Sequence, residues 1–335
     1  MENWNELPSL PDEEELKKIR KSLKYQNRKT ILTSLVLATA LILLFAFAVV
    51  PAAEKLYWSP YTYEYSDGSD LKLMLEAYTE LLNPGKEIRH LYASDIGFAS
   101  YDLSVMRVDS ATGEETYLNG SMIRGKIDLD YPFFDTSEEE MFLWGNNNLP
   151  EEMMTRYTED AAQRLSALPD YITVKAVAFF PKDLTMKQIQ QLIFKYNFDS
   201  NMGVDLCWIG IRNAPQGAET TPIACGFSTA PGTSTKINEF YPGFRLNEVK
   251  SDGTPLETHF KALLQFSADQ ADKGHGLFVR YKGEDLFRHV LDYVEENGVL
   301  SYGCLVTGTP DGLLAMLEDG TAESLILTDG WIDVS

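Results

Sequence analysis

The sequence predicts an α+β protein with a single N-terminal transmembrane helix, followed by an extracytoplasmic α+β domain with β-α-β units and a mixed sheet. Three observations carry this prediction. An uncharged apolar run spans residues 31–50, strand-like alternation and turns dominate residues 90–133, and strand–helix–strand patterns recur at 171–213 and 301–334. Two such units with intervening helices indicate helices packed on one face of a mixed sheet.

The apolar run predicts a membrane span. Its 20 residues form a helix of about 30 Å, which matches the hydrocarbon core of a bilayer, so we expect residues 31–50 to contact membrane lipid. A cleaved signal peptide is an alternative, because Pro51, Ala52 and Ala53 follow the run, but signal peptides have shorter apolar regions of about 7–15 residues. A buried core helix is a weaker alternative, because no polar face interrupts the run.

The flanking charges predict the orientation of this span. Seven bases precede it and act as topology anchors: Lys17, Lys18, Arg20, Lys21, Lys24, Arg28 and Lys29. Positive charge beside a membrane helix stays in the cytoplasm, so we expect residues 1–30 inside the cell and residues 51–335 outside, in a single-pass protein of the cell membrane. Tyr57 and Trp58 follow the span at the position of an outer aromatic belt.

The composition excludes nucleic acid as a partner. The chain has 29 bases and 50 acids, and the first 30 residues hold 7 and 6 of them, so the part beyond the span carries 22 bases against 44 acids. A surface with this excess of negative charge repels nucleic acid and anionic headgroups. Three cysteines, Cys207, Cys225 and Cys304, allow one disulfide but no disulfide framework, and we expect Cys207 and Cys304 to be buried in strands.

The N-terminal segment predicts an amphipathic helix. Asp12 is a helix N-cap, and Leu16, Ile19 and Leu23 follow at spacings of three and four residues, which places them on one helix face. Two interpretations are open. The apolar stripe either rests on the membrane surface or binds a partner protein, with Trp4, Leu7 and Leu10 as extra contacts.

The chain divides into segments of different composition. We expect a cytoplasmic basic and amphipathic segment (1–30), the span (31–50), a linker (51–67), a membrane-proximal mixed region (68–160) that is β-rich around 90–133, and a C-terminal α+β domain (161–335). Within these, helices are expected over 69–82 and 136–168, and a long surface excursion over 214–254, which is rich in Gly, Pro and Thr.

Catalytic motifs are absent from the sequence, and we predict neither an enzyme, a cofactor nor a metal site. There is no HExxH, GxSxG, SxxK or phosphate-binding loop, and the four histidines are expected to be surface or packed residues. The run Glu138-Glu139-Glu140 is expected to supply helix-start charges or a solvated face. An outer hydrolase would need a carboxylate constellation that no pattern singles out.

Three segments resemble the sigma-factor-regulator family of Gram-positive bacteria. Residues 17–37 resemble its basic helix and membrane span, and residues 174–211 and 293–317 resemble its C-terminal domain. The matching positions are Phe180, Leu184, Thr185, Trp208, Tyr302, Gly303, Val306, Thr307 and Gly308.

The resemblance implies a membrane anti-sigma factor. It implies that the cytoplasmic segment holds an extracytoplasmic-function sigma factor and that the outer domain is a sensor of envelope conditions, with an unknown envelope ligand. The segment is too short for a larger sigma-binding fold and has no Cys or His for zinc, so Leu16, Ile19 and Leu23 are expected to anchor one helix in a groove. The alternative is a membrane-anchored extracytoplasmic ligand- or protein-binding module with no transcriptional role.

Overall fold

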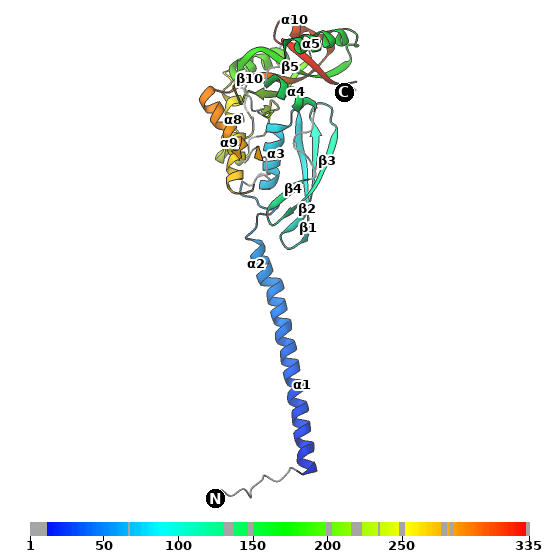
Figure 1. Ribbon diagram of the computed structural model, residues 1–335, viewed down its shortest axis with the longest axis vertical. Helices are drawn as coiled ribbons and strands as arrows, with labels where there is room; N and C mark the ends of the chain where they lie inside the picture. The colour runs from blue at the N-terminus through cyan, green and yellow to red at the C-terminus, as the bar shows by residue number, and fades with distance from the viewer. Residues whose placement is uncertain are drawn as a thin grey trace. The chain divides into compact units, whose positions relative to one another are not determined.

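A computed structural model describes residues 12–65, 68–129, 137–146, 150–198, 203–215, 223–233, 235–247, 252–275, 280–281 and 284–332. The chain divides into two compact units, residues 1–57 and residues 58–335. The predicted extra contacts, Trp4, Leu7 and Leu10, lie outside the described residues. Within the second unit the strands form two main sheets, which Figure 1 shows beneath and beside several helices.

The first unit contains one uninterrupted helix from Glu13 to Glu54. It consists of α1 (Glu13–Leu44), a π-helical turn (Phe45–Val49) and α2 (Val50–Glu54). Pro51 has no N–H to donate and its ring crowds the carbonyl four residues earlier, so a regular α-helix cannot pass through this position. The wider turn, in which the Val50 N–H bonds to the Phe45 carbonyl, carries the helix past the proline.

The second unit begins with a helix and a four-stranded antiparallel sheet. Ser69 caps α3 (Asp70–Leu82) by accepting a hydrogen bond from the Lys72 N–H at 3.2 Å. The strands follow in chain order: β1 (Lys86–Gly97), β2 (Ser100–Asp109), β3 (Glu115–Ile123) and β4 (Lys126–Leu129). Leu91, Val105 and Leu118 lie side by side across three strands and join the core to which α3 also contributes. The region expected to be β-rich, around 90–133, contains most of these four strands in its described part.

The five-stranded sheet has the order β11-β5-β10-β6-β7, and every printed pairing is antiparallel. Its strands are β5 (Ile172–Thr185), β6 (Val204–Ile211), β7 (Gly226–Ser228), β10 (Leu300–Gly308) and β11 (Ser324–Ile332). Both expected β-α-β units exist, through α6 (Met186–Ile193) and α10 (Pro310–Glu318). The expected mixed sheet is wrong. β10 lies between β5 and β6, the two strands of the first β-α-β unit. β5 lies between β10 and β11, the two strands of the second. Parallel strands are therefore never neighbours in this sheet.

Both faces of this sheet are buried. Along β5, Ala176, Ala178 and Phe180 join one apolar cluster, while Val177 and Phe179 join another that contains Phe142 of α4 (Ser137–Asn146). The helices therefore do not all pack on one face, as the sequence analysis expected. Gly145 allows the close approach of α4, because a Cβ at this position would lie 2.1 Å from the Phe179 ring.

Residues 214–254 do not form a surface excursion in their described part. They contain β7 and α7 (Ile237–Phe240), and their buried apolar side chains are Ala214, Ala224, Cys225, Phe227, Ile237, Phe244 and Leu246. A high content of Gly, Pro and Thr indicates turns in this segment, but it does not show whether the side chains between the turns are buried. The remaining elements are α5 (Glu151–Leu165), a π turn (Phe194–Phe198), α8 (Thr254–Asp272), β8 (Arg280–Tyr281), β9 (Glu284–Asp285) and α9 (Leu286–Asn297).

Trp58 is not part of an aromatic belt, contrary to the sequence analysis. Its side chain is buried in the second unit, where the indole stacks on the His275 ring with centroids 4.3 Å apart. Tyr65, at the end of the same segment, is also buried. An aromatic side chain that is packed inside a folded unit is unavailable to a membrane interface.

Candidate functional site

The N-terminal helix begins where the sequence indicates. The Asp12 carboxylate accepts hydrogen bonds from the backbone N–H groups of Glu14 and Glu15 at 3.0 and 2.7 Å. Three glutamates in the first turn face the positive end of the helix dipole. The start of α1 therefore carries its own capping and charge signals, which favour a helix from residue 13 onward.

The predicted anchor residues form an exposed apolar stripe on α1. Leu16, Ile19 and Leu23 are 41%, 47% and 52% exposed. At 100° per residue their side chains fall within about 60° of one another on the helix surface. A stripe of this width resembles the anchor pattern that helices present to a groove in a partner.

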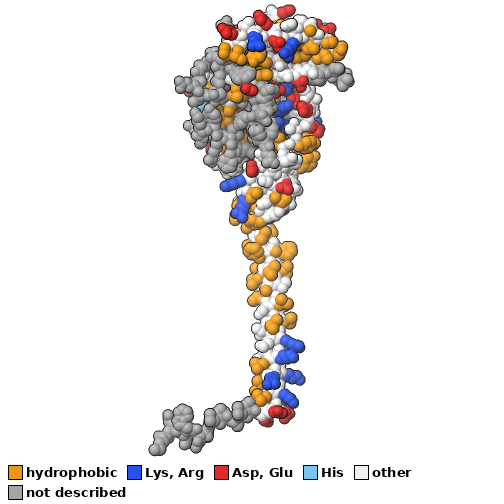
Figure 2. Space-filling view, turned by 45° about the vertical axis from the view of Figure 1, so that its right-hand side comes forward, with side chains coloured by type: hydrophobic (Ala, Val, Ile, Leu, Met, Phe, Trp, Pro, Cys, Tyr) orange, Lys and Arg blue, Asp and Glu red, His pale blue; other side chains and the backbone are white. Residues whose placement is uncertain are grey.

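The seven predicted topology anchors lie on the same helix, and all are exposed. Helical geometry turns most of these bases away from the apolar stripe, and Figure 2 shows Lys and Arg side chains gathered along one side of this helix. The helix is therefore amphipathic, as expected from the sequence.

The apolar run of the helix exposes its side chains on all sides. The large apolar side chains between Leu35 and Phe47 are at least half exposed. Figure 2 shows hydrophobic side chains covering this stretch of the helix. Among the described residues, one helix, Glu13–Glu54, is long enough and apolar enough to cross a membrane. It is not a buried core helix, because none of its most apolar window is buried. Water-soluble proteins seldom expose an apolar surface of this size, and lipid is the solvent that suits it.

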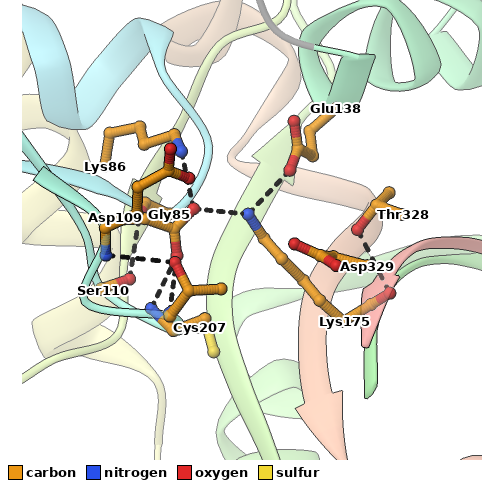
Figure 3. Close-up of polar contacts among 12 residues, drawn as sticks. Gly85, Lys86, Asp109, Ser110, Glu138, Lys175, Cys207, Thr328 and Asp329 are labelled. Carbon is orange, nitrogen blue, oxygen red and sulfur yellow. Dashed lines mark hydrogen bonds and ion pairs between the residues drawn. The ribbon is translucent and has the colours of Figure 1, made fainter. Parts of the chain in front are cut away.

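A buried charge cluster joins the two sheets of the second unit (Figure 3). The ammonium group of Lys175 on β5 lies 2.7 Å from Oδ2 of Asp109, at the end of β2, and 2.7 Å from Oε1 of Glu138 on α4. Lys86, at the start of β1, lies 2.6 Å from the same Asp109 oxygen. The second Asp109 oxygen accepts the N–H groups of Ala111 and Thr112. Every charge of the cluster therefore has an opposite charge or a hydrogen-bond donor beside it.

The electrostatics of this cluster favour the charged forms of Asp109, Glu138 and Lys175. Burial penalises the Asp109 carboxylate, but hydrogen bonds from Lys175 and Lys86 outweigh that penalty and hold the pKa of Asp109 well below its usual range. The pKa of Glu138 is lowered by Lys175 against the same penalty, and the pKa of Lys175 is raised by both carboxylates. The arrangement connects four elements, β1, β2, β5 and α4.

Sequence reasoning missed this cluster. It expected the Glu138 run to supply helix-start charges or a solvated face. Glu138 lies in the first turn of α4, but its side chain is buried against Lys175. Lys175 interrupts an apolar strand pattern, and a charge inside a run such as VKAVAFF is the signal that could have indicated a buried ion pair. Its partners lie 66 and 37 residues away in the chain, so no local pattern identifies them.

His259 on α8 is a second buried polar junction. Its Nε2 lies 2.8 Å from Oε1 of Glu80 on α3, and its Nδ1 lies 2.9 Å from the Gly243 carbonyl. Burial lowers the pKa of His259 and the nearby Arg245 lowers it further, but Glu80 and the Gly243 carbonyl dominate and raise the pKa above its ordinary value. Both ring nitrogens face acceptors, which favours the imidazolium form, and this packed role agrees with the expectation from the sequence.

The three cysteines are free thiols. Cys304 is buried as expected, and so is Cys225, whereas Cys207 is half-buried with its sulfur 3.4 Å from the Thr307 hydroxyl. No three His, Cys, Asp or Glu side chains of the described residues form a group that could hold a metal ion.

Comparison with known proteins places the second half of the chain in a family. Residues 165–327 match the family model described as sigma factor regulator C-terminal. The match extends from the end of α5 into β11, so it covers the interleaved five-stranded sheet and its helices. No curated protein and no solved structure matches the chain.

These findings define a membrane-anchored regulatory protein of the α+β class. An N-terminal helix suited to a bilayer precedes a domain from a regulatory family, and that family is not one of enzymes. Residues 165–327 are similar to the C-terminal domain of sigma factor regulators, which supports a role in regulating a sigma factor. The long apolar N-terminal helix suggests a single-pass membrane protein.

Proposed function

We propose that this protein is an anti-sigma factor that sequesters an extracytoplasmic-function sigma factor on the cytoplasmic side of the membrane. Leu16, Ile19 and Leu23 are the anchors that enter an apolar groove on the sigma factor. The second unit lies outside the membrane and responds to envelope conditions, and the response releases the sigma factor. The exposed apolar stripe on a helix that continues into the membrane-spanning run is the observation that supports this proposal.

The orientation follows from charge. The seven bases of α1 precede the apolar run, and positive charge is retained in the cytoplasm. A sigma factor is a cytoplasmic partner, so the same orientation that the charges favour also presents the stripe to the partner that the family implies. The acidic second unit then faces the envelope.

The test compares two single substitutions on α1. Ile19→Asp places a charge in the stripe, while Tyr25→Asp places the same charge on an exposed residue about 180° from Leu16. Each variant is purified from its own cells, and its bound proteins are identified by mass spectrometry alongside transcript profiling. We expect the sigma factor to be lost from Ile19→Asp and retained by Tyr25→Asp, with its target transcripts raised in the first strain alone.

Two results would contradict the proposal. Equal recovery of a sigma factor by both variants would mean that the stripe is not the contact. Recovery of envelope proteins alone, equally with both variants, would favour the membrane-anchored binding module without a transcriptional role. Membrane fractionation confirms that each variant is inserted.

A further inference from the structure

A cavity of about 710 Å³ lies beside α8 in the second unit. Its wall combines Glu64 and Tyr65 with residues around the end of α7, one side of α8, and Leu291 and Glu295 of α9. The volume is in the range of pockets that hold drug-sized ligands. Neither the charge cluster at Lys175 nor the stripe on α1 takes part in it, so it is a separate feature of the molecule.

Aromatic rings form one wall of this cavity. The Tyr65 ring contacts Phe240 and Tyr241 edge-on, with centroids 5.3 and 5.9 Å apart. Phe240 remains 58% exposed, although a large apolar side chain gains free energy when it is covered. The rings therefore offer both an apolar surface and the electron-rich faces that attract cations.

Carboxylates outnumber ammonium groups in the cavity wall. Four acids line it, Glu64, Glu257, Asp269 and Glu295, against two bases. Both bases are paired with acids of the wall, Lys261 with Glu257 at 2.7 Å and Lys273 with Glu64 at 2.9 Å. The excess of negative charge therefore remains after the internal pairs are formed.

Asp269 is held in place largely by neutral donors. Its carboxylate accepts hydrogen bonds from the Tyr241 hydroxyl at 2.9 Å and from Gln265 at 2.6 Å. Arg288 lies 3.9 Å from Asp269 but directs its closer contact, at 2.7 Å, to Asp272. Asp269 lines the cavity, and its negative charge is only partly neutralised.

Lys273 shows how this wall can stabilise a cation. Its ammonium group lies 5.7 Å from the centroid of the Tyr65 ring and 3.2 Å from the Tyr65 hydroxyl, in addition to its pair with Glu64. Burial disfavours its charge, but the bonds to Glu64 and Tyr65 outweigh burial and raise its pKa. A cation from the chain itself is therefore stabilised by one aromatic ring and one carboxylate of the wall.

We propose that this cavity binds a small amphiphilic organic cation, an apolar body that carries one ammonium group. The apolar body covers Phe240 and packs against the neighbouring tyrosine rings, while the carboxylates of α8 and α9 balance the ammonium charge. The cavity is a binding site whether or not α1 holds a sigma factor. Its use as the input that releases the sigma factor rests on the proposed function.

Three probes that share one body test the charge requirement. 4-Phenylbutylamine, 4-phenylbutanol and 4-phenylbutyrate are titrated at pH 7 into the full-length protein in detergent, with saturation-transfer NMR and calorimetry as readouts. We expect the amine to bind about tenfold more tightly than the alcohol, because the alcohol lacks the ion pair and the cation–π contact, and the carboxylate to bind most weakly. Equal affinity of amine and alcohol would overturn the proposal.

Matched variants test the location. Phe240→Ala and Glu295→Gln change exposed groups of the wall, so both proteins should fold, and each should weaken binding of the amine severalfold. Tyr171→Ala and Glu318→Gln make the same kinds of change at exposed positions outside the wall and should leave binding unchanged. Unaltered binding by both wall variants would show that the amine binds elsewhere, which would also overturn the proposal.

A reporter for the sigma factor separates this inference from the proposed function. If the amine binds in the cavity and also raises transcription from the sigma-dependent promoter, both are supported. If it binds there and leaves transcription unchanged, the binding site stands and its role as an input is wrong.

Discussion

The ammonium group of Lys175 lies 2.7 Å from the Asp109 carboxylate, and the two side chains are 2% and 3% exposed. This ion pair connects β5 of the family domain to the end of β2 in the four-stranded sheet. A buried pair is costly to form and still more costly to break, because removal of one partner leaves an uncompensated charge in the core.

Replacement of Lys175 by methionine should therefore strongly destabilise the second unit. Lys175→Met leaves Asp109 and Glu138 buried without their shared cation, and we expect a loss of about 3–5 kcal/mol in the free energy of unfolding. Urea titration followed by circular dichroism measures it. Arg164→Met removes an exposed pair with Asp160 on α5 and should cost less than about 0.5 kcal/mol. Equal losses in the two variants would contradict the assigned role of the buried pair.

The pH dependence of stability should reveal the His259 imidazolium. Its folded-state pKa is raised, so its contribution is fully present below the unfolded-state value of about 6.5 and is lost as pH rises through the folded-state value. We expect wild type to lose stability from pH 6 to pH 9 relative to His259→Gln, whose amide does not titrate. Glu80 and Arg245 are the charged groups that act on this ring.

Unfolding free energies of both proteins, measured across this pH range, provide the comparison. A difference between them that stays constant with pH would mean that folding does not shift the pKa of His259.

Two glycines with similar backbone angles should respond differently to alanine. Gly253 and Gly274 have φ of +76° and +74°, so alanine strains either position by about 1 kcal/mol. At Gly253 a Cβ would also lie 2.4 Å from the Lys187 nitrogen, whereas nothing lies within 4 Å at Gly274. We expect Gly253→Ala to cost about 1–3 kcal/mol more than Gly274→Ala, from the added steric clash. Thermal unfolding of the two variants tests this, and equal melting temperatures would disprove the close approach of the two segments.

The proposed orientation predicts a labelling pattern in intact cells. Ser22→Cys and Ser94→Cys each introduce an exposed thiol, one on α1 and one on β1. A membrane-impermeant maleimide should label Ser94→Cys in intact cells and Ser22→Cys only after permeabilisation, because the basic flank is held inside. Wild-type protein provides the background from the native cysteines. The reverse labelling pattern would show that the topology is the opposite of the one proposed. In that topology α1 lies outside the cytoplasm, where it cannot contact a sigma factor.

Local patterns in the sequence were sufficient for most individual elements. The apolar run VDLCWIGI corresponds to β6, and Thr185 caps α6 through a reciprocal pair with Gln188. The turns and alternation expected over 90–133 correspond to the β2–β3 pairing, in which Val105 lies opposite Leu118. In each case the signal and its consequence lie within a few residues of one another, where propensity and capping act.

Contacts between residues far apart in the chain could not be predicted from the sequence. The order of the strands depends on which strand inserts beside β5, and nothing in the β5 sequence identifies β10, more than a hundred residues later. The partners of Lys175 and the burial of Trp58 against His275 likewise depend on the assembled fold. The candidate anchors Leu16, Ile19 and Leu23 were visible because a helix face is a local property, and their function remains a proposal.

The five-stranded sheet cannot form until the C-terminal part of the chain has been synthesised. β10 is the strand that pairs with both β5 and β6, so these two strands keep unpaired edges until residues 300–308 have been made. Strands that must wait for a distant partner fold slowly, and open edges promote aggregation. A chain that is cut shortly before residue 300 retains most of its mass but should be recognised by quality-control proteases as unfolded.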